Sequence, residues 1–302
     1  MTAQRMQLDE SRWHFQHGPI DVVIGAKGRP DATEAGHARA WARFTSILDE
    51  LVSELGQLKQ AVNGPCALHG VVARRMWQAC RPHCTVFITP MAAVAGSVAE
   101  ELIACYAIDG ITSAWVNNGG DIALHLVPGQ ALRIGLYADL KNLDAREIRD
   151  GISTDGQFEI SSAMPVRGVA TSGWRGRSFS LGIADSVTVL ARTASEADAA
   201  ASIIANAVNI NDPGIKRQPA CDMKDDSDLG KLPVTVDVPR LAPEKVQIAL
   251  AAGWTKAEEL RTRGLIWSAV LVCQGQVVTS QRSDAEIPDF SEVRQQVGSV
   301  FA

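Results

Sequence analysis

The stretch Ser113-Ala-Trp-Val-Asn-Asn-Gly-Gly-Asp-Ile-Ala-Leu-His-Leu126 predicts two β-strands joined by a tight turn. Apolar, β-prone residues fill both flanks, and Asn-Gly between such flanks is a strong hairpin signal. The paired glycines, Gly119 and Gly120, tolerate positive φ and expose backbone N–H groups, as a turn that binds a phosphate or a carbonyl requires. A plain hairpin and a ligand-binding turn are both open for residues 117–121, and spacing alone favours the plain hairpin.

The elements around this hairpin mix helices and strands without a regular alternation, which predicts an α+β fold rather than a doubly wound sheet. Apolar residues at helical spacing indicate helices, and β-rich runs between turn residues indicate strands. Helices are expected at 35–61, 70–80, 91–107, 195–208 and 243–263. Strands are expected in a hairpin at 12–29 and at 85–88, 113–116, 120–126, 132–137, 185–191, 265–273 and 276–280.

The composition is that of a globular protein with a large apolar core. Of 302 residues, 46% are hydrophobic and 21% are charged, enough for one large domain or two packed lobes. A net charge of −5 and few aromatic residues argue against binding to nucleic acid. Neither a membrane span nor a secretory signal is expected, because charged residues interrupt every apolar run. We therefore expect a cytoplasmic protein that does not bind membranes and whose six cysteines are free thiols.

Cysteine and histidine residues gather near residue 80 in a pattern that zinc could use: Cys80, His83 and Cys84, with Cys66 and His69 upstream. Against this, Cys80 ends a predicted helix and Pro82 interrupts the segment. No second tight pair of ligands is present either. Buried thiols and a loop histidine are therefore the favoured interpretation.

Two further segments carry polar residues that packing explains poorly. The first, Gly168-Val-Ala-Thr-Ser-Gly-Trp-Arg-Gly-Arg177, combines adjacent hydroxyls, glycines and two arginines. These groups could hold a pyrophosphate, and a polar loop between strands explains the composition equally well.

The second segment places Asp198 and Ser202 four residues apart on a predicted helix, so the two side chains share one face. A carboxylate and a hydroxyl there could bind a hard cation such as Mg²⁺. Alternatively, Ser195 is the N-cap and Asp198 the third residue of an ordinary capped helix. That alternative explains Asp198 and leaves Ser202 unexplained.

Residues 209–233 form an acidic stretch rich in Pro and Gly that separates the predicted helix before it from a C-terminal α/β segment. Its aspartates could mimic a calcium loop. Because the glycine and the glutamate that such a loop needs are missing, we expect a solvated loop.

Taken in order, these segments resemble the ApbE superfamily of FAD:protein FMN transferases, in its UPF0280 branch. The matching pieces are Asn118-Gly-Gly-Asp121, Ala170-Thr-Ser-Gly173, Ser186-Val-Thr-Val189 and Glu196-Ala-Asp-Ala199 with Ser202. The resemblance implies an ApbE-like, T-fold-related α+β fold of mixed sheets packed with helices. It implies one domain over residues 1–302, built of two intimate lobes.

The resemblance also implies site residues and ligands. In the transferases, the Gly-Gly-Asp and Thr-Ser-Gly segments line the FAD site, and an aspartate and a hydroxyl four residues later help to hold Mg²⁺ at the FAD pyrophosphate. The resemblance therefore implies a flavin cofactor, FAD or FMN, together with Mg²⁺. Carried over, the flavin-binding residues are Asn118, Gly119, Gly120, Asp121, Thr171, Ser172 and Gly173, and the metal ligands are Asp198 and Ser202. An acceptor flavoprotein is an implied partner, and a small-residue helix would suit a homodimer.

The chain departs from the family pattern where the transferases carry a His-x-x-Asp-Pro-x-Thr-Gly motif. Here residues 177–185 run directly into Ser186, and no histidine follows His125. The family's Lys-Gly is replaced by Ala95-Gly96. Asp185 could serve as a base instead, or simply begin a buried strand. Two functions stay open: Mg²⁺-dependent FMN transfer or cleavage of the FAD pyrophosphate, and non-catalytic binding of a flavin or another planar ligand.

Overall fold

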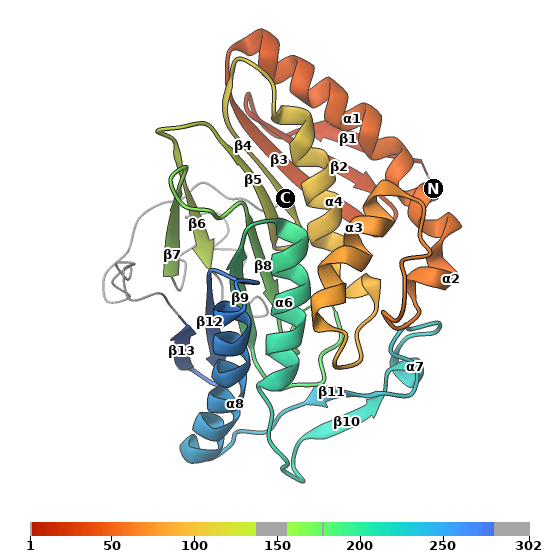
Figure 1. The fold of residues 1–302 in the computed structure, drawn as a ribbon, viewed down its shortest axis with the longest axis vertical. Coiled ribbons are helices and arrows are strands. Elements are labelled where there is room, and N and C mark those ends of the chain that lie inside the picture. The colour runs from red at the N-terminus through yellow and green to blue at the C-terminus, as the bar shows by residue number, and fades with distance from the viewer. Residues whose placement is uncertain (1, 137–155, 177, 281–302) are drawn as a thin grey trace.

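Nine strands form one sheet, in which every neighbouring pair is antiparallel (Figure 1). The computed structural model describes residues 2–136, 156–176 and 178–280. Across the sheet the order is β1 (Gln4–Gln7), β2 (Arg12–His17), β3 (Ile20–Gly28), β4 (Ile111–Asn118), β5 (Asp121–Leu126), β8 (Gly168–Ser172), β9 (Ser186–Ala191), β12 (Ser268–Cys273) and β13 (Gln276–Ser280). Two separate hairpins pair β6 (Ala131–Leu136) with β7 (Gly156–Ser161) and β10 (Lys216–Pro219) with β11 (Pro233–Asp237).

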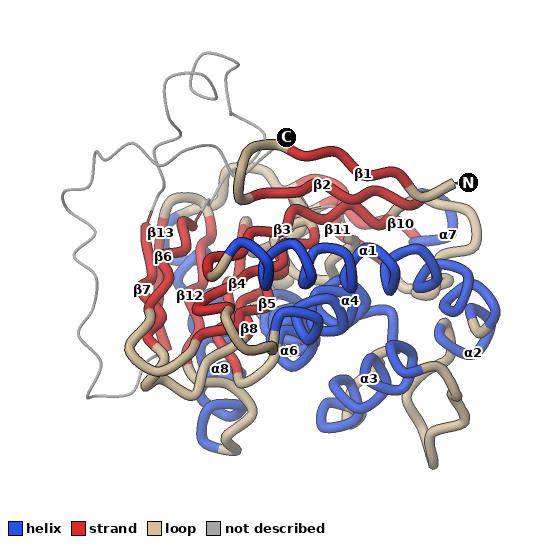
Figure 2. Tube along the Cα trace, turned by 90° about the horizontal axis from the view of Figure 1, so that it is seen from above, coloured by secondary structure: helices blue, strands red, loops and turns tan. Residues whose placement is uncertain are grey.

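The long helices cover one face of this sheet, as Figures 1 and 2 show from two directions. The helices are α1 (Pro30–Ser53), α2 (Leu55–Leu58), α3 (Val71–Cys80), α4 (Val94–Ile103), α6 (Ala194–Ala207), α7 (Ala220–Met223) and α8 (Pro243–Thr262). Three short 3₁₀ turns lie at η1 (Arg81–His83), η2 (Pro90–Ala93) and η3 (Ala104–Tyr106). Among the described residues, no helix combines the length and apolar character that a membrane crossing demands.

Buried side chains form three clusters that share the sheet. One packs β2, β3 and β4 against α1 and α4, around Phe15 and Phe44. A second packs β9 and β12 against α6 and α8, around Ile204 and Leu250. The third lies on the opposite face, where the β6–β7 hairpin adds Ile160 to residues of β5, β8, β9 and β12. The strands therefore alternate their side chains between a helix-covered face and a hairpin-covered face.

The predicted α+β class is confirmed, as are the hairpin at 12–29, the hairpin around Asn118-Gly119 and most helices. Helix starts follow local signals. α1 and α8 begin with prolines in the first turn, where the missing N–H is not needed. α6 begins at a side-chain N-cap, where the Thr193 hydroxyl oxygen accepts a hydrogen bond from the Glu196 N–H at 3.3 Å.

Three predictions of structure were wrong. Residues 85–88 form no strand, because Ile88 bonds to Val62 outside the sheet and β-propensity needs a partner strand. The helix expected at 35–61 begins at Pro30, and α1 ends at Ser53 before the short α2. Residues 209–233 are not one loop, since they contain β10, α7 and the start of β11. The predicted strand end at Tyr137 lies outside the described residues.

Candidate functional site

The turn between β4 and β5 is a two-residue hairpin, with Asn118 directly opposite Asp121. Gly119 and Gly120 adopt positive φ angles of +67° and +111°, which residues other than glycine rarely adopt. The side chain of Asn117 accepts a hydrogen bond from the Gly120 N–H at 2.8 Å and holds the turn. The glycines are thus needed for the backbone conformation, and a ligand contact here stays a prediction.

Buried side chains tie this hairpin to its neighbours. The Asn118 side-chain amide donates to the carbonyl oxygen of Ala95, next to the start of α4, at 3.1 Å. The Asp121 carboxylate accepts a hydrogen bond from the Thr171 N–H on β8 at 3.1 Å. The fold therefore brings together the first and second predicted site segments at the beginning of α4.

Asp198 lies on α6 and contacts the start of α4. Its Oδ2 accepts a hydrogen bond from the Gly96 N–H at 2.9 Å. The N-cap residue of α4, Ala93, has no side-chain acceptor, so Asp198 satisfies an N–H of the first turn from a neighbouring helix. Gly96 permits this approach, because a Cβ there would lie 2.3 Å from the carbonyl oxygen of Ala194.

Negative charge concentrates around Asp198. Burial and the nearby Asp121 carboxylate raise its pKa well above the ordinary range, although the N–H groups of Gly96 and Ala95 act in the opposite direction. Burial, Asp198 and Asp228 likewise raise the pKa of the Cys80 thiol. No described lysine or arginine forms an ion pair with Asp198. The arrangement favours either a neutral carboxyl group or a bound cation.

The capping interpretation of Asp198 is wrong. Thr193, not Ser195, is the N-cap of α6, and Glu196 occupies the third helical position. The Ser195 hydroxyl instead donates a hydrogen bond to the Glu100 carboxylate of α4 at 2.7 Å. Ser202 lies one turn after Asp198, is half-buried, and forms no hydrogen bond with the described residues. Capping of α6 therefore explains neither Asp198, which instead binds the first turn of α4, nor Ser202.

Thr171 points away from this pair. Val169, two residues before Thr171, belongs to the core on the hairpin-covered face, and the adjacent Ala170 belongs to the core beneath α6. By alternation, the hydroxyl of Thr171 lies on the hairpin-covered face, where it shares a hydrogen bond of 2.9 Å with the Thr188 hydroxyl. The side chain of Ser172 lies on the helix-covered face. The structure thus separates the Thr171 hydroxyl from Asp198 and Ser202.

Asp185 anchors the segment that follows β8. Its carboxylate binds the Arg175 guanidinium at 3.1 Å, the Trp174 indole N–H at 3.3 Å and the Gln274 backbone N–H. Gly173 packs against this corner, where a Cβ would lie 2.4 Å from the Asp185 carbonyl oxygen. These contacts favour the structural interpretation of Asp185 over a base. Arg177, the second arginine of the predicted cradle, lies outside the described residues.

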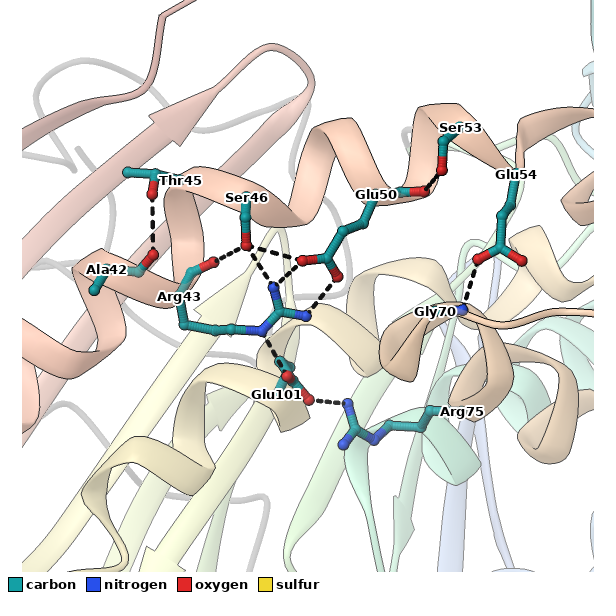
Figure 3. A network of polar contacts seen from close by, with 10 residues as sticks. All are labelled: Ala42, Arg43, Thr45, Ser46, Glu50, Ser53, Glu54, Gly70, Arg75 and Glu101. Carbon is teal, nitrogen blue, oxygen red and sulfur yellow. Dashed lines mark hydrogen bonds and ion pairs between the residues drawn. The ribbon is translucent and has the colours of Figure 1, made fainter.

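A network of ion pairs holds α4 in place (Figure 3). Glu101 accepts hydrogen bonds from Arg43 of α1 at 2.7 Å and from Arg75 of α3 at 2.8 Å. Arg43 also binds Glu50 with both ends of its guanidinium. The preceding residue, Glu100, pairs with Arg75 at 3.1 Å and accepts a hydrogen bond from the Ser195 hydroxyl of α6 at 2.7 Å. The helices that carry Gly96 and Asp198 are therefore fixed relative to each other.

The sequence missed Asp228, which accepts a hydrogen bond from the Thr89 hydroxyl before η2. Its only signal was membership of the acidic stretch. The zinc interpretation gains no support: the Cys80 thiol is buried and contacts the Thr89 carbonyl oxygen at 3.3 Å, and Cys84 contacts Arg81. Within the described part of the chain, no group of three or more His, Cys, Asp or Glu side chains could hold a metal ion.

Comparisons with known proteins give consistent results. A family model described as AbpE bacteria matches residues 3–279. A UPF0280 protein of Methanothermobacter thermautotrophicus is 38% identical over 214 residues, which cover 69% of this chain and 71% of the relative. A UPF0280 protein of Methanopyrus kandleri is 34% identical over 208 residues, covering 68% and 78%.

Solved structures of lower identity also match. A mutant of the flavin transferase ApbE from Vibrio cholerae gives a TM-score of 0.46 at 13% identity, covering 93% of this chain and 98% of that one. The ApbE protein of Thermotoga maritima gives 0.46 at 13% identity, covering 92% and 97%.

Proposed function

This chain belongs to the AbpE bacteria family and to the UPF0280 proteins, and on that premise we propose that it binds a flavin nucleotide, FAD or FMN, together with Mg²⁺. The ligand would lie where the β4–β5 hairpin, the start of α4 and α6 meet. The flavin assignment rests on the motif resemblance. The metal assignment rests on one observation: the Asp198 carboxylate lies beside Asp121, and no described lysine or arginine forms an ion pair with Asp198.

The residues present fit Mg²⁺. Asp198 and Ser202 supply oxygen atoms one helical turn apart, and a carboxylate has lone pairs beyond the one that Gly96 uses. The described residues do not form a closed cage of metal ligands. That suits Mg²⁺, which is commonly held by one or two carboxylates and by the phosphates of its substrate. Bound there, Mg²⁺ would supply positive charge to neutralise the pyrophosphate.

The remaining site residues take separate roles in this proposal. Gly119 and Gly120 let the hairpin backbone approach the ligand, while Asn118 and Asp121 hold the hairpin against α4 and β8. Ser172, on the helix-covered face, would bind a phosphate oxygen. Thr171, whose hydroxyl faces the other way, and Gly173 contribute backbone structure. An acceptor flavoprotein, a cytoplasmic location and a homodimer stay predictions.

FMN transfer is the second candidate, favoured by the retained spacing of Asp198 and Ser202. In that reaction an acceptor hydroxyl oxygen would bond to the FMN phosphorus, the bond from that phosphorus to the AMP oxygen would break, and the hydroxyl proton would pass to a base. General-base assistance contributes about 10²–10⁴ in rate. Since Asp185 is occupied by Arg175, Trp174 and Gln274, binding without turnover is the function that the geometry supports best.

The test uses full-length protein purified without added flavin. FAD and, separately, FMN are titrated in by calorimetry with MgCl₂ and with EDTA, and the FAD mixture is analysed by mass spectrometry for AMP. Mg²⁺-dependent binding without AMP supports the proposal, and AMP release supports the transferase. Failure of FAD and FMN to bind under either condition contradicts the flavin assignment.

A further inference from the structure

Helix α8 carries apolar residues on two faces, although only one of them is buried. It is the outermost helix of the layer, with α6 beside it and β12 and β13 beneath it (Figure 1). On its inner face Gly253 packs so closely that a Cβ there would lie 2.2 Å from the Val208 side chain. On its outer face Ile248 and Trp254 are 59% and 41% exposed. A helix that is apolar on all sides is normally covered on all sides.

The outer face of α8 has the spacing of a helix that packs along another helix. Ile248, Ala251 and Thr255 follow one another at three and four residues and form its central row, with Ala252 beside them. All four residues are exposed. The sequence has no charged residue between Lys245 and Lys256. The small alanine side chains let a second helix approach closely.

Trp254 adds an aromatic side chain that is held in place. Its indole N–H donates to the Thr279 carbonyl oxygen of β13 at 3.3 Å, so the ring is oriented although much of it is exposed. A side chain that is already ordered loses little entropy on binding, and tryptophan is enriched among the residues that dominate interface energies. The indole is therefore suited to anchor a partner.

Charged residues at the two ends of this face indicate which partner fits. Lys245, Ala252 and Glu259 lie seven residues apart along one edge of the face. A second copy of α8, antiparallel and related by a two-fold axis near Gly253, would set each Lys245 beside Glu259 of the other copy. It would also set the two Trp254 rings beside each other. A parallel copy would instead oppose like charges.

These two charged side chains remain accessible to such a partner. Lys245 pairs with Asp212 and Glu259 pairs with Arg263, but both keep nearly half of their side-chain surface exposed. Exposed ion pairs add little affinity, whereas opposed like charges are costly. The charges therefore select the antiparallel orientation, and the apolar centre supplies most of the binding energy.

We infer that the outer face of α8 binds the same face of a second copy of this chain in an antiparallel two-fold dimer. Such self-complementary contacts are the commonest kind in homo-oligomers. The small-residue helix α4 does not offer this surface, because Gly96, Val98, Ala99 and Leu102 are buried. A contact between two helices is below about 1,200 Å², so we expect a dimer that dissociates at micromolar concentration.

The test is sedimentation equilibrium of the full-length protein from about 1 µM to about 100 µM, where a reversible monomer–dimer equilibrium is expected. Ala252→Glu places two carboxylates together near the two-fold axis and should raise the dissociation constant at least about tenfold. Ala38→Glu, on the exposed surface of α1, is the matched control and should dimerise like the wild type. Thermal unfolding checks that each variant is folded.

Charge reversal tests the orientation. Lys245→Glu and Glu259→Lys should each weaken the dimer, and the double variant should restore it, because opposite charges face each other again. A wild type that stays monomeric at about 100 µM overturns the inference and leaves this face to a different protein or to solvent. Wild-type association by Ala252→Glu overturns it as well, since the dimer then uses another surface. A double variant no better than the single variants rules out the antiparallel register.

Discussion

The carboxylate of Asp198 on α6 lies 2.9 Å from the backbone nitrogen of Gly96 on α4. One side chain thus joins two helices that are far apart in the sequence, and it satisfies an N–H that the α4 N-cap leaves without a side-chain partner. The contact also holds the carboxylate close to Asp121. Structural and proposed metal-binding roles therefore meet at one residue, and substitutions can separate them.

Asp198→Asn should preserve the contact with Gly96 while removing the charge. We expect Mg²⁺-dependent FAD affinity to fall by at least about tenfold, since an amide is a poorer ligand for a hard cation. Asp198→Ala should show the same loss and also cost about 1 kcal/mol of unfolding free energy, because the helix start loses its acceptor. Calorimetry and urea unfolding measure the two effects. Unchanged Mg²⁺ dependence in both variants would falsify the metal assignment.

The contribution of Ser202 to Mg²⁺-dependent FAD binding should depend only on its hydroxyl oxygen. Ser202→Ala is expected to raise the Mg²⁺ concentration needed for half-maximal FAD binding several-fold, because a neutral oxygen ligand is lost. Ser202→Thr keeps that oxygen and should behave like the wild type. Ser53→Ala, on the exposed part of α1, is the matched control. If Ser202→Ala and Ser53→Ala give the same titration, Ser202 is no ligand.

Gly96→Ala should disturb the site by crowding. Its Cβ would fall 2.3 Å from the Ala194 carbonyl oxygen, so α4 and α6 must separate. We expect a loss of about 1–3 kcal/mol in unfolding free energy and weaker FAD binding. Gly56→Ala, where a Cβ meets nothing within 4 Å, should be neutral or stabilising. Gly96→Ala with wild-type stability would show that this helix contact is dispensable.

Ser172 and Thr171 should differ although they are adjacent. Alternation along β8 places the Ser172 side chain on the helix-covered face and the Thr171 hydroxyl against Thr188. Ser172→Ala should therefore weaken FAD binding more than Thr171→Val, as measured by calorimetry at saturating Mg²⁺. The reverse order would mean that the nucleotide lies on the hairpin-covered face.

Glu101→Gln should lower the free energy of unfolding mainly at neutral pH, where the wild-type carboxylate is ionised. Burial raises the pKa of Glu101, but its hydrogen bonds and charge interactions with Arg43 and Arg75 outweigh burial and leave it below the ordinary value. A carboxylate with a lowered folded-state pKa stabilises the fold above its unfolded pKa, and that contribution is lost as pH falls through the folded value. We expect a deficit of roughly 1.5–3 kcal/mol at pH 7 in the variant.

The deficit in Glu101→Gln should shrink as the pH falls below about 4.5, the ordinary pKa of a glutamate, because the wild type then loses the same contribution. Urea unfolding at a series of pH values measures it. A difference between the two proteins that is constant with pH contradicts the assignment of this stability to the ionised Glu101.

Much of the fold is visible in the sequence because its signals are local. Asn118-Gly119 between β-prone runs predicted the hairpin, and helical spacing predicted α3, α6 and α8 nearly to their ends. The Thr193 N-cap is also a local signal, although the prediction of Ser195 as the N-cap was wrong by two residues. The strand prediction for residues 85–88 was wrong because strand formation depends on a non-local contact. Their β-propensity was real, but no partner strand lies beside them, and pairing is not a local property.

The sequence by itself determined the α+β class, the hairpin at Gly119-Gly120 and the spacing that puts Asp198 and Ser202 on one face of a helix. These depend on backbone preferences and on the helical repeat, which act over a few residues. Only the tertiary structure decided that Asp198 meets Gly96 and Asp121 and that Thr171 turns toward Thr188. Those contacts depend on strand register and on close helix packing between distant segments, because a shift of one residue in register turns each side chain to the other face.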